Sequence, residues 1–360
     1  MIYPHGWILG VMSIKDKPLD HSGFVLPYVL IVIFILALAG SITALRLQNT
    51  TNILVSMQAS ERTSRMMDSA ENVAIFALMS GNAVQEGYDL NPQSLIQSEF
   101  GLINSSGIPV DQRVANQIVP DIWEAFGGLR KVQTQEGYVV LSLQDVSGLA
   151  SLNNPSHVSF DAILKLIGGS TRETNQLRQR LADYIDLDDQ RRPLGAEERD
   201  YKLRDMKPPS NSPLRSYAEL SSVLGWSEVL NRVDLREIKE RTTLQANVNY
   251  RPIFAKGPES RELGFNETSL LSNNFDPLTD GVAALSKVPT GHMRLTLWAQ
   301  RQIGLWDKRI IEISRQAGHI SAPYTRQSVL EVTILEEQLE FNVQEMNEIK
   351  NVIETTSFRP

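Results

Sequence analysis

The sequence predicts an α+β fold, in which a long N-terminal helix packs on an antiparallel sheet and a large, mostly helical domain is inserted into that sheet. Three observations support this prediction. Residues 24–45 contain no charged side chain, and residues 46–80 contain neither Pro nor Gly. Segments rich in β-forming residues lie at 138–143 and between 294 and 335. The region between these segments has helical periodicity, so helices interrupt the sheet along the chain.

The first element is a helix that crosses a membrane and then continues. Over residues 24–45 a helix is roughly 33 Å long at ~1.5 Å per residue, and the apolar core of a bilayer is ~30 Å thick. The alternative is a buried core helix, but core helices of this length are rarely free of charge on every side. Beyond Arg46, small and apolar residues recur at helical spacing, so the same helix becomes amphipathic and ends at the breakers Gly81 and Asn82.

The flank before this helix predicts a leader peptide. A secretory signal peptide has its small-residue cleavage site after the apolar run. Here the candidate cut lies before the run, between Gly23 and Phe24, which gives a leader over residues 1–23. An ordinary signal anchor is the alternative. The start of the leader stays open, because either Met1 or Met12 can initiate the chain.

Composition excludes several classes of function. The net charge is -7, whereas binding to nucleic acid rewards clustered Lys and Arg. The chain has no cysteine, which excludes disulfides, thiol nucleophiles and cysteine-ligated metal sites. The sequence lacks the nucleophile-elbow, zinc-protease, phosphate-loop and dinucleotide motifs, and its five histidines are scattered. The sequence therefore argues against an enzyme and against a protein that binds nucleic acid.

The rest of the chain divides into strands, then helices, then strands again. Within the helical region, Leu177, Leu181 and Tyr184 share one helix face. The first predicted elements are a short helix around 118–129, a strand at 138–143 and a turn at 145–153 built on Asp145 and Gly148. Helices follow between 159 and 225, with one apolar face at 160–167 and a short helix at 217–225, and residues 250–290 are mostly loop. The last predicted elements are strands at 294–299, 309–315 and 328–335 and an ambiguous acidic segment at 336–354.

Residues 181–201 contain a dense cluster of carboxylate side chains. Ca²⁺ takes about 6–8 oxygen ligands, and acidic turns supply them. In the register of an EF-hand loop, Asp186, Asp188 and Glu197 occupy the first, third and twelfth places. Arg191 stands at the sixth place, where that loop requires Gly, so the stretch is a candidate calcium loop and not an EF-hand. The alternative is a solvated surface, because basic residues balance the acidic ones in this region.

Together, these features resemble the K-type minor pseudopilin family of the bacterial type II secretion system (general secretion pathway protein K). The resemblance covers roughly residues 23–249 and is most specific from Leu181 to Tyr201, although the family usually has Trp in place of Tyr184. The family commonly reads Asn-Gly-Arg-Phe-Asn where residues 147–151 read Ser-Gly-Leu-Ala-Ser. Further matches, in family order, are Asp145, Gly148, Leu152, Asn153, Pro208, Pro209, Asn211, Ala218, Glu219, Leu220, Val223, Gly225, Asn247, Val248 and Asn249.

The resemblance implies a pilin-like organisation and a processed N-terminus. A prepilin peptidase would cut between Gly23 and Phe24, leaving a single-pass protein of the inner membrane whose C-terminal domain lies in the periplasm. Most pseudopilins carry Glu at the fifth mature position, where this chain has Tyr28. The implied parts are a leader at 1–23, a transmembrane and assembly helix at 24–81, a pseudopilin α/β domain at 82–150 and 286–340, and an inserted helical domain at 151–285.

The resemblance also implies a role, partners and a metal. A carboxylate in lipid is costly unless it is paired, so a subunit without one suits the tip of the periplasmic pseudopilus, where nothing lies above it. Family members assemble with the I- and J-type minor pseudopilins and support secretion of folded proteins across the outer membrane. The family binds structural calcium in the insertion, and by position the implied ligands are Asp186, Asp188 and Glu197, together with Asp183, Asp189, Glu198 and Asp200.

Two other classes of function stay open from the residues. Residues 219–225 look like a helix-hairpin-helix element, which would make the chain a membrane-anchored DNA-binding protein, although Lys and Arg are not concentrated there. The acidic cluster alone would also suit an anchored hydrolase that depends on Asp186, since paired carboxylates perform acid–base work.

Overall fold

The structure is a computed structural model of the whole chain, and it forms two units, Met1–Gln58 and Ala59–Pro360. It describes residues 25–91, 96–98, 101–103, 120–155, 168–246, 248–255, 287–316 and 323–352. Three parts of the sequence-based prediction lie outside the described residues: the leader with Gly23 and Phe24, the helix face at 160–167 and most of the loop at 250–290.

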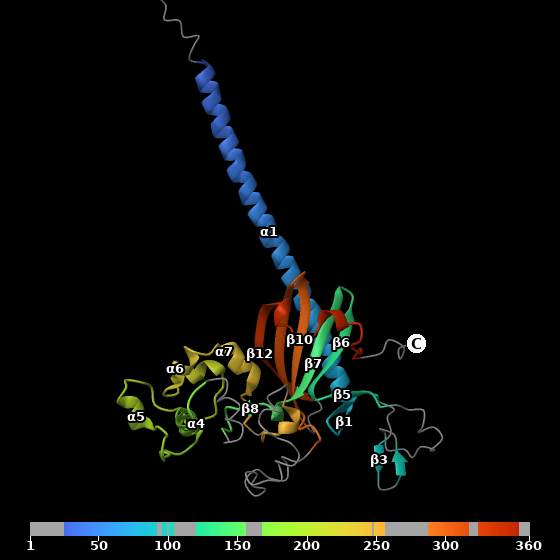
Figure 1. Cartoon of the computed structure of the whole chain (residues 1–360), viewed down its shortest axis with the longest axis vertical. Coiled ribbons are helices and arrows are strands. Elements are labelled where there is room, and N and C mark those ends of the chain that lie inside the picture. Colours follow the sequence, from blue (N-terminus) through green and yellow to red (C-terminus); the bar gives the residue numbers. More distant parts are fainter. Residues whose placement is uncertain are drawn as a thin grey trace, which may run out of the picture. The chain divides into compact units, whose positions relative to one another are not determined.

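The predicted N-terminal helix is confirmed as α1, Val25–Ser80 (Figure 1). The hydroxyl groups of Ser41 and Thr43 donate to carbonyls one turn earlier, at 2.9 and 2.8 Å, so these polar groups are satisfied inside the helix. The helix ends at Gly81, as predicted. A Cβ at Gly81 would lie 2.8 Å from the carbonyl oxygen of Asp89, so this close approach of two backbones requires Gly.

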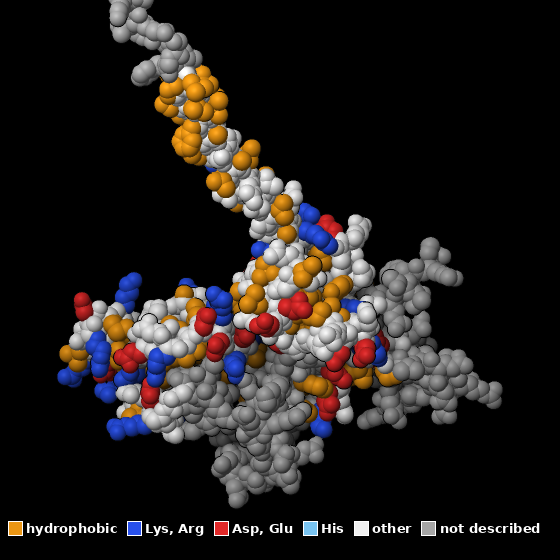
Figure 2. All heavy atoms as spheres, turned by 45° about the horizontal axis from the view of Figure 1, so that its top comes forward, with side chains coloured by type: hydrophobic (Ala, Val, Ile, Leu, Met, Phe, Trp, Pro, Cys, Tyr) orange, Lys and Arg blue, Asp and Glu red, His pale blue; other side chains and the backbone are white. Residues whose placement is uncertain are grey.

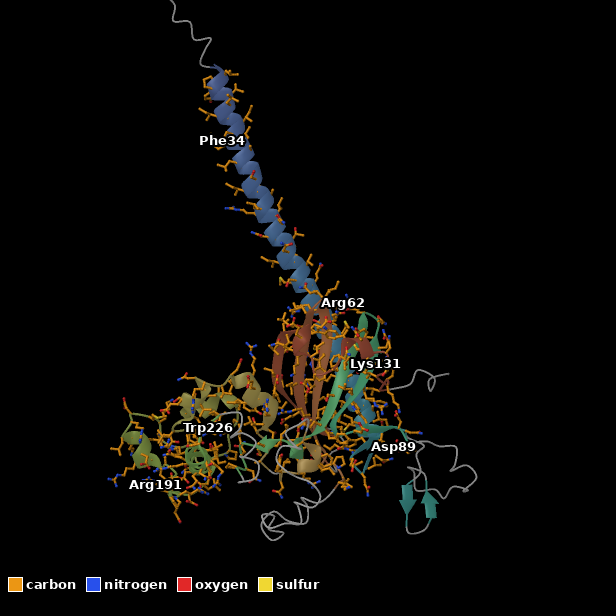
Figure 3. All side chains as sticks on the ribbon, viewed as in Figure 1. Phe34, Arg62, Asp89, Lys131, Arg191 and Trp226 are labelled. Carbon is orange, nitrogen blue, oxygen red and sulfur yellow. The ribbon has the colours of Figure 1, made fainter. Side chains whose placement is uncertain are left out.

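In the first unit, α1 exposes apolar side chains on all sides. Figure 2 shows hydrophobic side chains gathered on this part of the helix, and Figure 3 labels Phe34 there. Tyr28 and Phe34 are 69% and 68% exposed. By length and composition α1 is able to cross a membrane, which agrees with the predicted membrane anchor.

The second unit is built on a five-stranded antiparallel sheet with the strand order β12-β11-β10-β7-β6. The predicted strands at 138–143, 294–299, 309–315 and 328–335 all lie in this sheet and are confirmed. β7 and β10 are neighbours although they are far apart in the sequence, with Asp145 opposite Met293. The strands are β6 (Phe126–Thr134), β7 (Gly137–Asp145), β10 (His292–Gln302), β11 (Leu305–Arg315) and β12 (Tyr324–Leu335).

Smaller strands surround this sheet, and one of them overturns a prediction. The helix predicted around 118–129 is wrong, because the described residues of this stretch form β5 and the start of β6. Trp123 is buried while its neighbours in β5 face outward, which is the alternation of a strand. Gly127 has a φ of 110° and breaks any helical path. The smaller strands are β1 (Asn82–Val84), β2 (Gly87–Asp89) and β5 (Ile122–Glu124), which form one sheet; β3 (Ile96–Ser98) and β4 (Gly101–Ile103), which form a hairpin; and β8 (Ala150–Ser151) and β9 (Thr242–Thr243), which pair in parallel.

Alternation along the central strands gives the large sheet two different faces. Val139, Leu141 and Leu143 of β7 are fully buried in a core that they share with α1. The helix contributes residues spaced three and four apart, as expected for one helix face. They are Met66, Met67, Ala70, Ala74, Ile75, Ala77 and Leu78. The predicted packing of the helix on the sheet is therefore confirmed.

Part of the opposite face is covered by residues 336–352, which we name the C-terminal strap. The strap pairs with the edge of the sheet, because the N–H of Lys131 in β6 donates to the carbonyl of Lys350 at 2.9 Å (Figure 3 labels Lys131). Its apolar side chains pack on Trp298 and Trp306 of the sheet, and they are Leu339, Phe341, Val343, Met346 and Ile349. The segment that was ambiguous in the sequence thus has two short 3₁₀ turns, η6 (Glu336–Gln338) and η7 (Val343–Glu345).

Between β7 and β10 the chain forms short helices whose core also includes Ile310 of β11 and Val329 and Leu330 of β12. The predicted face of Leu177, Leu181 and Tyr184 is confirmed on α4, where all three are buried. Trp226 is fully buried beside them, and its Nε1 donates to the carbonyl of Leu177 at 3.2 Å (Figure 3). The helix predicted at 217–225 is a 3₁₀ helix followed by Gly225 at a φ of 88°. The elements are η2 (Val146–Gly148), α4 (Thr171–Ile185), α5 (Glu198–Lys202), η3 (Tyr217–Ser222), α6 (Trp226–Leu230), α7 (Leu235–Arg241) and η4 (Pro252–Phe254).

One buried carboxylate joins the two ends of this helical region. Asp145, at the end of β7, accepts the N–H of Ser147 at 2.8 Å and the N–H of Thr290 at 2.6 Å. Gly148 follows, and a Cβ there would lie 2.0 Å from the carbonyl oxygen of Phe254. The turn predicted at Asp145 and Gly148 is therefore the place where the chain leaves the sheet, and Asp145 also holds the segment that returns to it.

A buried ion pair ties the helical region to the centre of the sheet. Arg294 of β10 and Glu312 of β11 lie 2.6 Å apart, and both side chains are 2% exposed. The same guanidinium donates to the carbonyls of Lys239 and Glu240 in the last turn of α7, at 3.0 and 2.7 Å, and to that of Thr242 at 2.6 Å. Cations favour the C-terminal end of a helix, so Arg294 fixes this end of α7 to the sheet.

Candidate functional site

The predicted acidic stretch forms a loop between two helices. α4 ends with Asp186 as its C-cap, and α5 begins with Glu197 as its N-cap. We name residues 186–197 the acidic loop; Arg191 in this loop is labelled in Figure 3. The rings of Tyr184 and Tyr201 lie 6.3 Å apart, so the two helices pack against each other where the loop leaves and returns.

One arginine lies between two of the predicted ligands. Arg192 Nη1 is 2.7 Å from Asp183 Oδ1 and also contacts Asp186 Oδ2. The backbone N–H of Arg192 donates to Asp183 Oδ2 at 3.2 Å, and Asp183 is fully buried. A Cβ at Gly195 would lie 1.8 Å from the same carboxylate, so Gly195 is required for the loop to close over Asp183. These contacts bring the start and the end of the acidic loop together.

Glu197 is the most perturbed carboxylate of the group. Its side chain is buried, and its backbone N–H donates to Asp200 Oδ2 at 3.2 Å. Burial raises the pKa of Glu197 to about 7, and the negative charges of four aspartates add to this effect. These aspartates, in order of effect, are Asp183, Asp186, Asp189 and Asp188. The glutamate therefore shares a region of concentrated negative charge with the other predicted ligands.

Asp188 and Asp189 lie on the exposed side of the loop. Asp188 Oδ1 accepts the N–H of Gln190 at 2.8 Å, which shapes the turn. Asp189 Oδ1 accepts a hydrogen bond from Asn211 Nδ2 at 3.0 Å. Asn211 belongs to a separate turn that the sequence did not connect with the acidic loop, because the two stretches are far apart along the chain.

The last two predicted ligands make other contacts. Glu198 Oε1 lies 2.6 Å from Lys202 Nζ in a pair one helical turn apart, and both side chains are exposed. Asp200 lies 3.5 Å from Arg191 and also accepts the N–H of Glu197. Glu198 therefore faces solvent, whereas Asp200 holds the start of α5 in place.

Two buried oxygen atoms of this group lack a hydrogen-bond partner among the described residues, Oδ1 of Asp186 and Oε1 of Glu197. Hard cations such as Ca²⁺ bind oxygen ligands, so the donor set suits such an ion. Within the described ranges, no three acidic or histidine side chains converge as a ready metal site, and Arg192 supplies the positive charge between Asp183 and Asp186. Binding of a cation would therefore require the carboxylates to draw together.

The helix-hairpin-helix alternative finds little support in this region. Residues 217–230, which include the predicted element, carry no Lys or Arg and contain Glu219 and Glu228. One basic group that contacts this region, Arg180, donates to the carbonyl of Leu224 at 3.4 Å, and burial together with Arg204 lowers its pKa. A surface of this kind offers little to a phosphate backbone.

A family match covers this site. Residues 140–233 match the family described as "Type II secretion system (T2SS), protein K". The matched segment runs from β7 to just before α7 and includes the whole acidic loop. The family resemblance predicted from the sequence is confirmed over these residues.

A comparison with solved structures finds a likeness to a chain in "The Crystal Structure of the GspK-GspI-GspJ complex from enterotoxigenic Escherichia coli Type 2 Secretion System". The sequence identity is 16% and the TM-score is 0.44, over 77% of this chain and 98% of that chain. A comparison with curated proteins found no match.

Proposed function

We propose that this chain, which carries a type II secretion protein K domain over residues 140–233, is a minor pseudopilin that caps the tip of a periplasmic pseudopilus. In this role it supports the secretion of folded proteins across the outer membrane. One observation carries the proposal: the matched domain and a helix able to cross a membrane occur in the same chain. The chain acts as a structural subunit, and we assign it no reaction.

The N-terminal helix determines where the protein resides. The charge-free part of α1 would hold the chain in the bacterial inner membrane as a single pass, and the unit Ala59–Pro360 would lie in the periplasm. A prepilin peptidase would remove the leader between Gly23 and Phe24. The new N-terminus would then be followed directly by the apolar helix.

Two features favour a place at the tip. Tyr28 is the fifth residue after the cut, where a carboxylate would need a partner from the subunit above it. A chain with Tyr at this position has no such requirement. The helical region between β7 and β10 adds bulk that would hinder stacking of a further subunit on top.

The proposed partners are the I- and J-type minor pseudopilins, contacted mainly through α1. The similar solved structure is a complex of GspK, GspI and GspJ. The exposed apolar side chains Leu54 and Met57 of α1 are the kind of surface that packs against a neighbouring helix. Their position beyond the charge-free run places this contact outside the bilayer core.

The test is capture of the full chain from detergent extracts. The chain is expressed with a prepilin peptidase and with tagged I- and J-type subunits. We expect it to co-purify with the tagged subunits and to have the mass of a chain that begins at Phe24. Leu54→Glu combined with Met57→Glu should reduce capture, because two apolar contacts become charged. Gln58→Glu, an exposed polar position of the same helix, is the matched control and should not.

The proposal fails if the wild-type chain is captured by neither subunit while the two tagged subunits still bind each other. A chain that keeps its leader in the presence of active peptidase would contradict the processing step. Salt-sensitive retention on DNA would instead favour the helix-hairpin-helix alternative.

We also propose that the acidic loop binds one or more structural Ca²⁺ ions. By position, Asp186, Asp188 and Glu197 would hold the ion, with Asp183 and Asp189 nearby. The unpartnered oxygens of Asp186 and Glu197 support this proposal, since buried oxygens without donors are rare in folded proteins. A bound Ca²⁺ would supply the positive charge that offsets these carboxylates.

Without calcium, the second unit is expected to lose stability as the pH rises from 4.5 to about 7. In this range Glu197 keeps its proton in the folded chain and loses it in the unfolded chain, so the folded state binds more protons and deprotonation opposes folding. The loss is about 3.5 kcal/mol at most, at ~1.4 kcal/mol per unit of pKa. Calcium should remove it, because the cation favours ionised Glu197 and binds the folded state.

Chemical denaturation at pH 5 and pH 8, with chelator or with calcium, measures this effect. Glu197→Gln should abolish the loss in chelator, whereas Glu198→Gln, the exposed neighbour paired with Lys202, should leave it unchanged. Equal pH dependence in wild type and Glu197→Gln would contradict the assignment to Glu197. A melting temperature that is the same in chelator and in calcium would contradict the calcium proposal itself.

A further inference from the structure

The C-terminal strap, residues 336–352, lies against an edge strand of the large sheet. The outer side of such a strand presents N–H and C=O groups that pair readily with another extended chain. At Lys131 of β6 the strap makes this pairing. The N–H of Lys131 donates to the carbonyl of Lys350, and the N–H of Val352 donates to the carbonyl of Lys131, both at 2.9 Å. The strap therefore occupies this edge as an added strand would.

The surface beneath the strap is aromatic and basic. Trp298 and Trp306 are fully buried there, and the ring of Phe341 in the strap lies 5.4 and 6.0 Å from theirs, edge-on to both. Nζ of the buried Lys308 lies 2.9 Å from Oε1 of Glu340. This surface thus suits an extended, acidic segment with apolar side chains. The strap has that composition, because its charged residues are Glu336, Glu337, Glu340, Glu345, Glu348 and one basic residue, Lys350.

Release of the strap would not leave Lys308 without a counter-charge. Its Nζ also lies 2.9 Å from Oε1 of Glu240, in the last turns of α7. Removing the partner of a buried charge is costly when the charge then stays unpaired. Here a second carboxylate remains, so departure of Glu340 leaves a neutral pair behind.

Two further features lower the cost of opening. Nε1 of Trp306 is buried without a hydrogen-bond partner among the described residues. A buried indole N–H without an acceptor costs free energy, and water would satisfy it once the strap had left. The apolar side chains of the strap are only partly buried, so its release exposes less apolar surface than release of a core segment would.

From these contacts we infer that the strap is a releasable cover over a docking surface for an extended, acidic segment of another protein. The docking surface consists of the edge of β6 at Lys131 together with Trp298, Trp306 and Lys308. The strap and the incoming segment compete for the same main-chain bonds, the same ammonium group and the same two aromatic rings. Added strands take affinity from main-chain bonds and specificity from alternate side chains. The strap opens while the rest of the sheet stays folded.

A reversible lock tests this inference in the full chain in detergent micelles. Lys131→Cys combined with Asn351→Cys places two thiols at paired positions, and Cα atoms of paired strands are close enough for a disulfide. The natural chain has no cysteine, so no other disulfide forms within it. The probe is a fluorescent peptide with the sequence of residues 336–352, and anisotropy measures its binding. The reduced variant should bind the peptide, whereas the oxidised variant should not. Equal binding by both forms would overturn the inference.

A single substitution in the strap should have the opposite effect to the lock. We expect Glu340→Gln to bind the peptide about 10-fold more tightly than the wild type, because the competing strap loses its charged bond to Lys308. Glu337→Gln, an exposed glutamate of the same strap, is the matched control and should bind as the wild type does. A peptide with Gln at every glutamate position should bind more weakly. Equal binding of the two peptides would overturn recognition of an acidic segment.

Hydrogen exchange of the wild-type chain tests release itself. The amides of Lys131 and Val352 should exchange faster than those of Val139 and Leu141 in β7, because local opening requires less free energy than global unfolding. Exchange at the same rate would show that the strap opens only with the whole sheet, and the inference would then be wrong. It would be equally wrong if neither Glu340→Gln nor the reduced lock bound the peptide.

Discussion

Replacing Arg294 with Met is expected to lower the free energy of unfolding of the second unit by about 3–5 kcal/mol, the usual cost of breaking a buried ion pair. The change leaves the carboxylate of Glu312 buried without its counter-charge. It also leaves the carbonyls of Lys239, Glu240 and Thr242 without their donor. Both losses act at the joint between α7 and the sheet, so this joint should open first.

Urea denaturation of the full chain in micelles measures this loss, and limited proteolysis locates it. Arg232→Met is the matched control, because Arg232 pairs with Glu173 at 2.7 Å but both side chains are about half exposed. Exposed pairs contribute about 0–1 kcal/mol, so the control should differ little from the wild type. If the two variants are equally stable, Arg294 does not have the structural role that its burial indicates.

Replacing Gly148 with Ala is expected to cost about 3 kcal/mol, at the upper end of the usual range for overpacking. The new Cβ would lie 2.0 Å from the carbonyl oxygen of Phe254 and 2.7 Å from the backbone N of Ala255. Backbone atoms cannot rotate away as the end of a side chain can, so the two segments must separate. The bonds of Asp145 that lie beside this contact should weaken with it.

Thermal denaturation of the wild type and the variant measures this cost. Gly304→Ala is the control, because Gly304 has a φ of 76° and no atom lies within 4 Å of its added Cβ. That control carries the conformational cost of an L-residue at positive φ, roughly 1–2 kcal/mol, without any clash. If Gly148→Ala has the same melting temperature as Gly304→Ala, the end of β7 moves aside with little loss of stability.

The parts of the fold that could be predicted are those determined by residues close together in the sequence. The charge-free run predicted α1, and alternating or β-branched segments predicted the strands that pair in the sheet. The failure around 118–129 has a physical cause, because this stretch includes Gly127, whose positive φ does not fit a helix. The sequence also could not show that Asp145 reaches Thr290, since nothing local links residues so far apart.

The candidate site was predictable only in part. The density of carboxylates identified the acidic loop, but residue spacing does not reveal which of them face inward. Glu198 pairs with Lys202 on the surface, whereas Asp183 is fully buried beneath Arg192. The sequence assigns Asn211 no role, because its position beside Asp189 arises from tertiary contacts.

The pairing of β7 with β10 has a consequence for the order in which the chain folds. Asp145 lies opposite Met293, yet the whole helical region lies between them in the sequence. Pairings across such a separation form slowly, because the entropy of closing a long loop is lost before any contact compensates for it. The helical region has local helices, and most buried residues of the core around them come from the region itself, so it is able to collapse early and shorten the loop that must close. The centre of the sheet is then assembled late, after the segment that interrupts it.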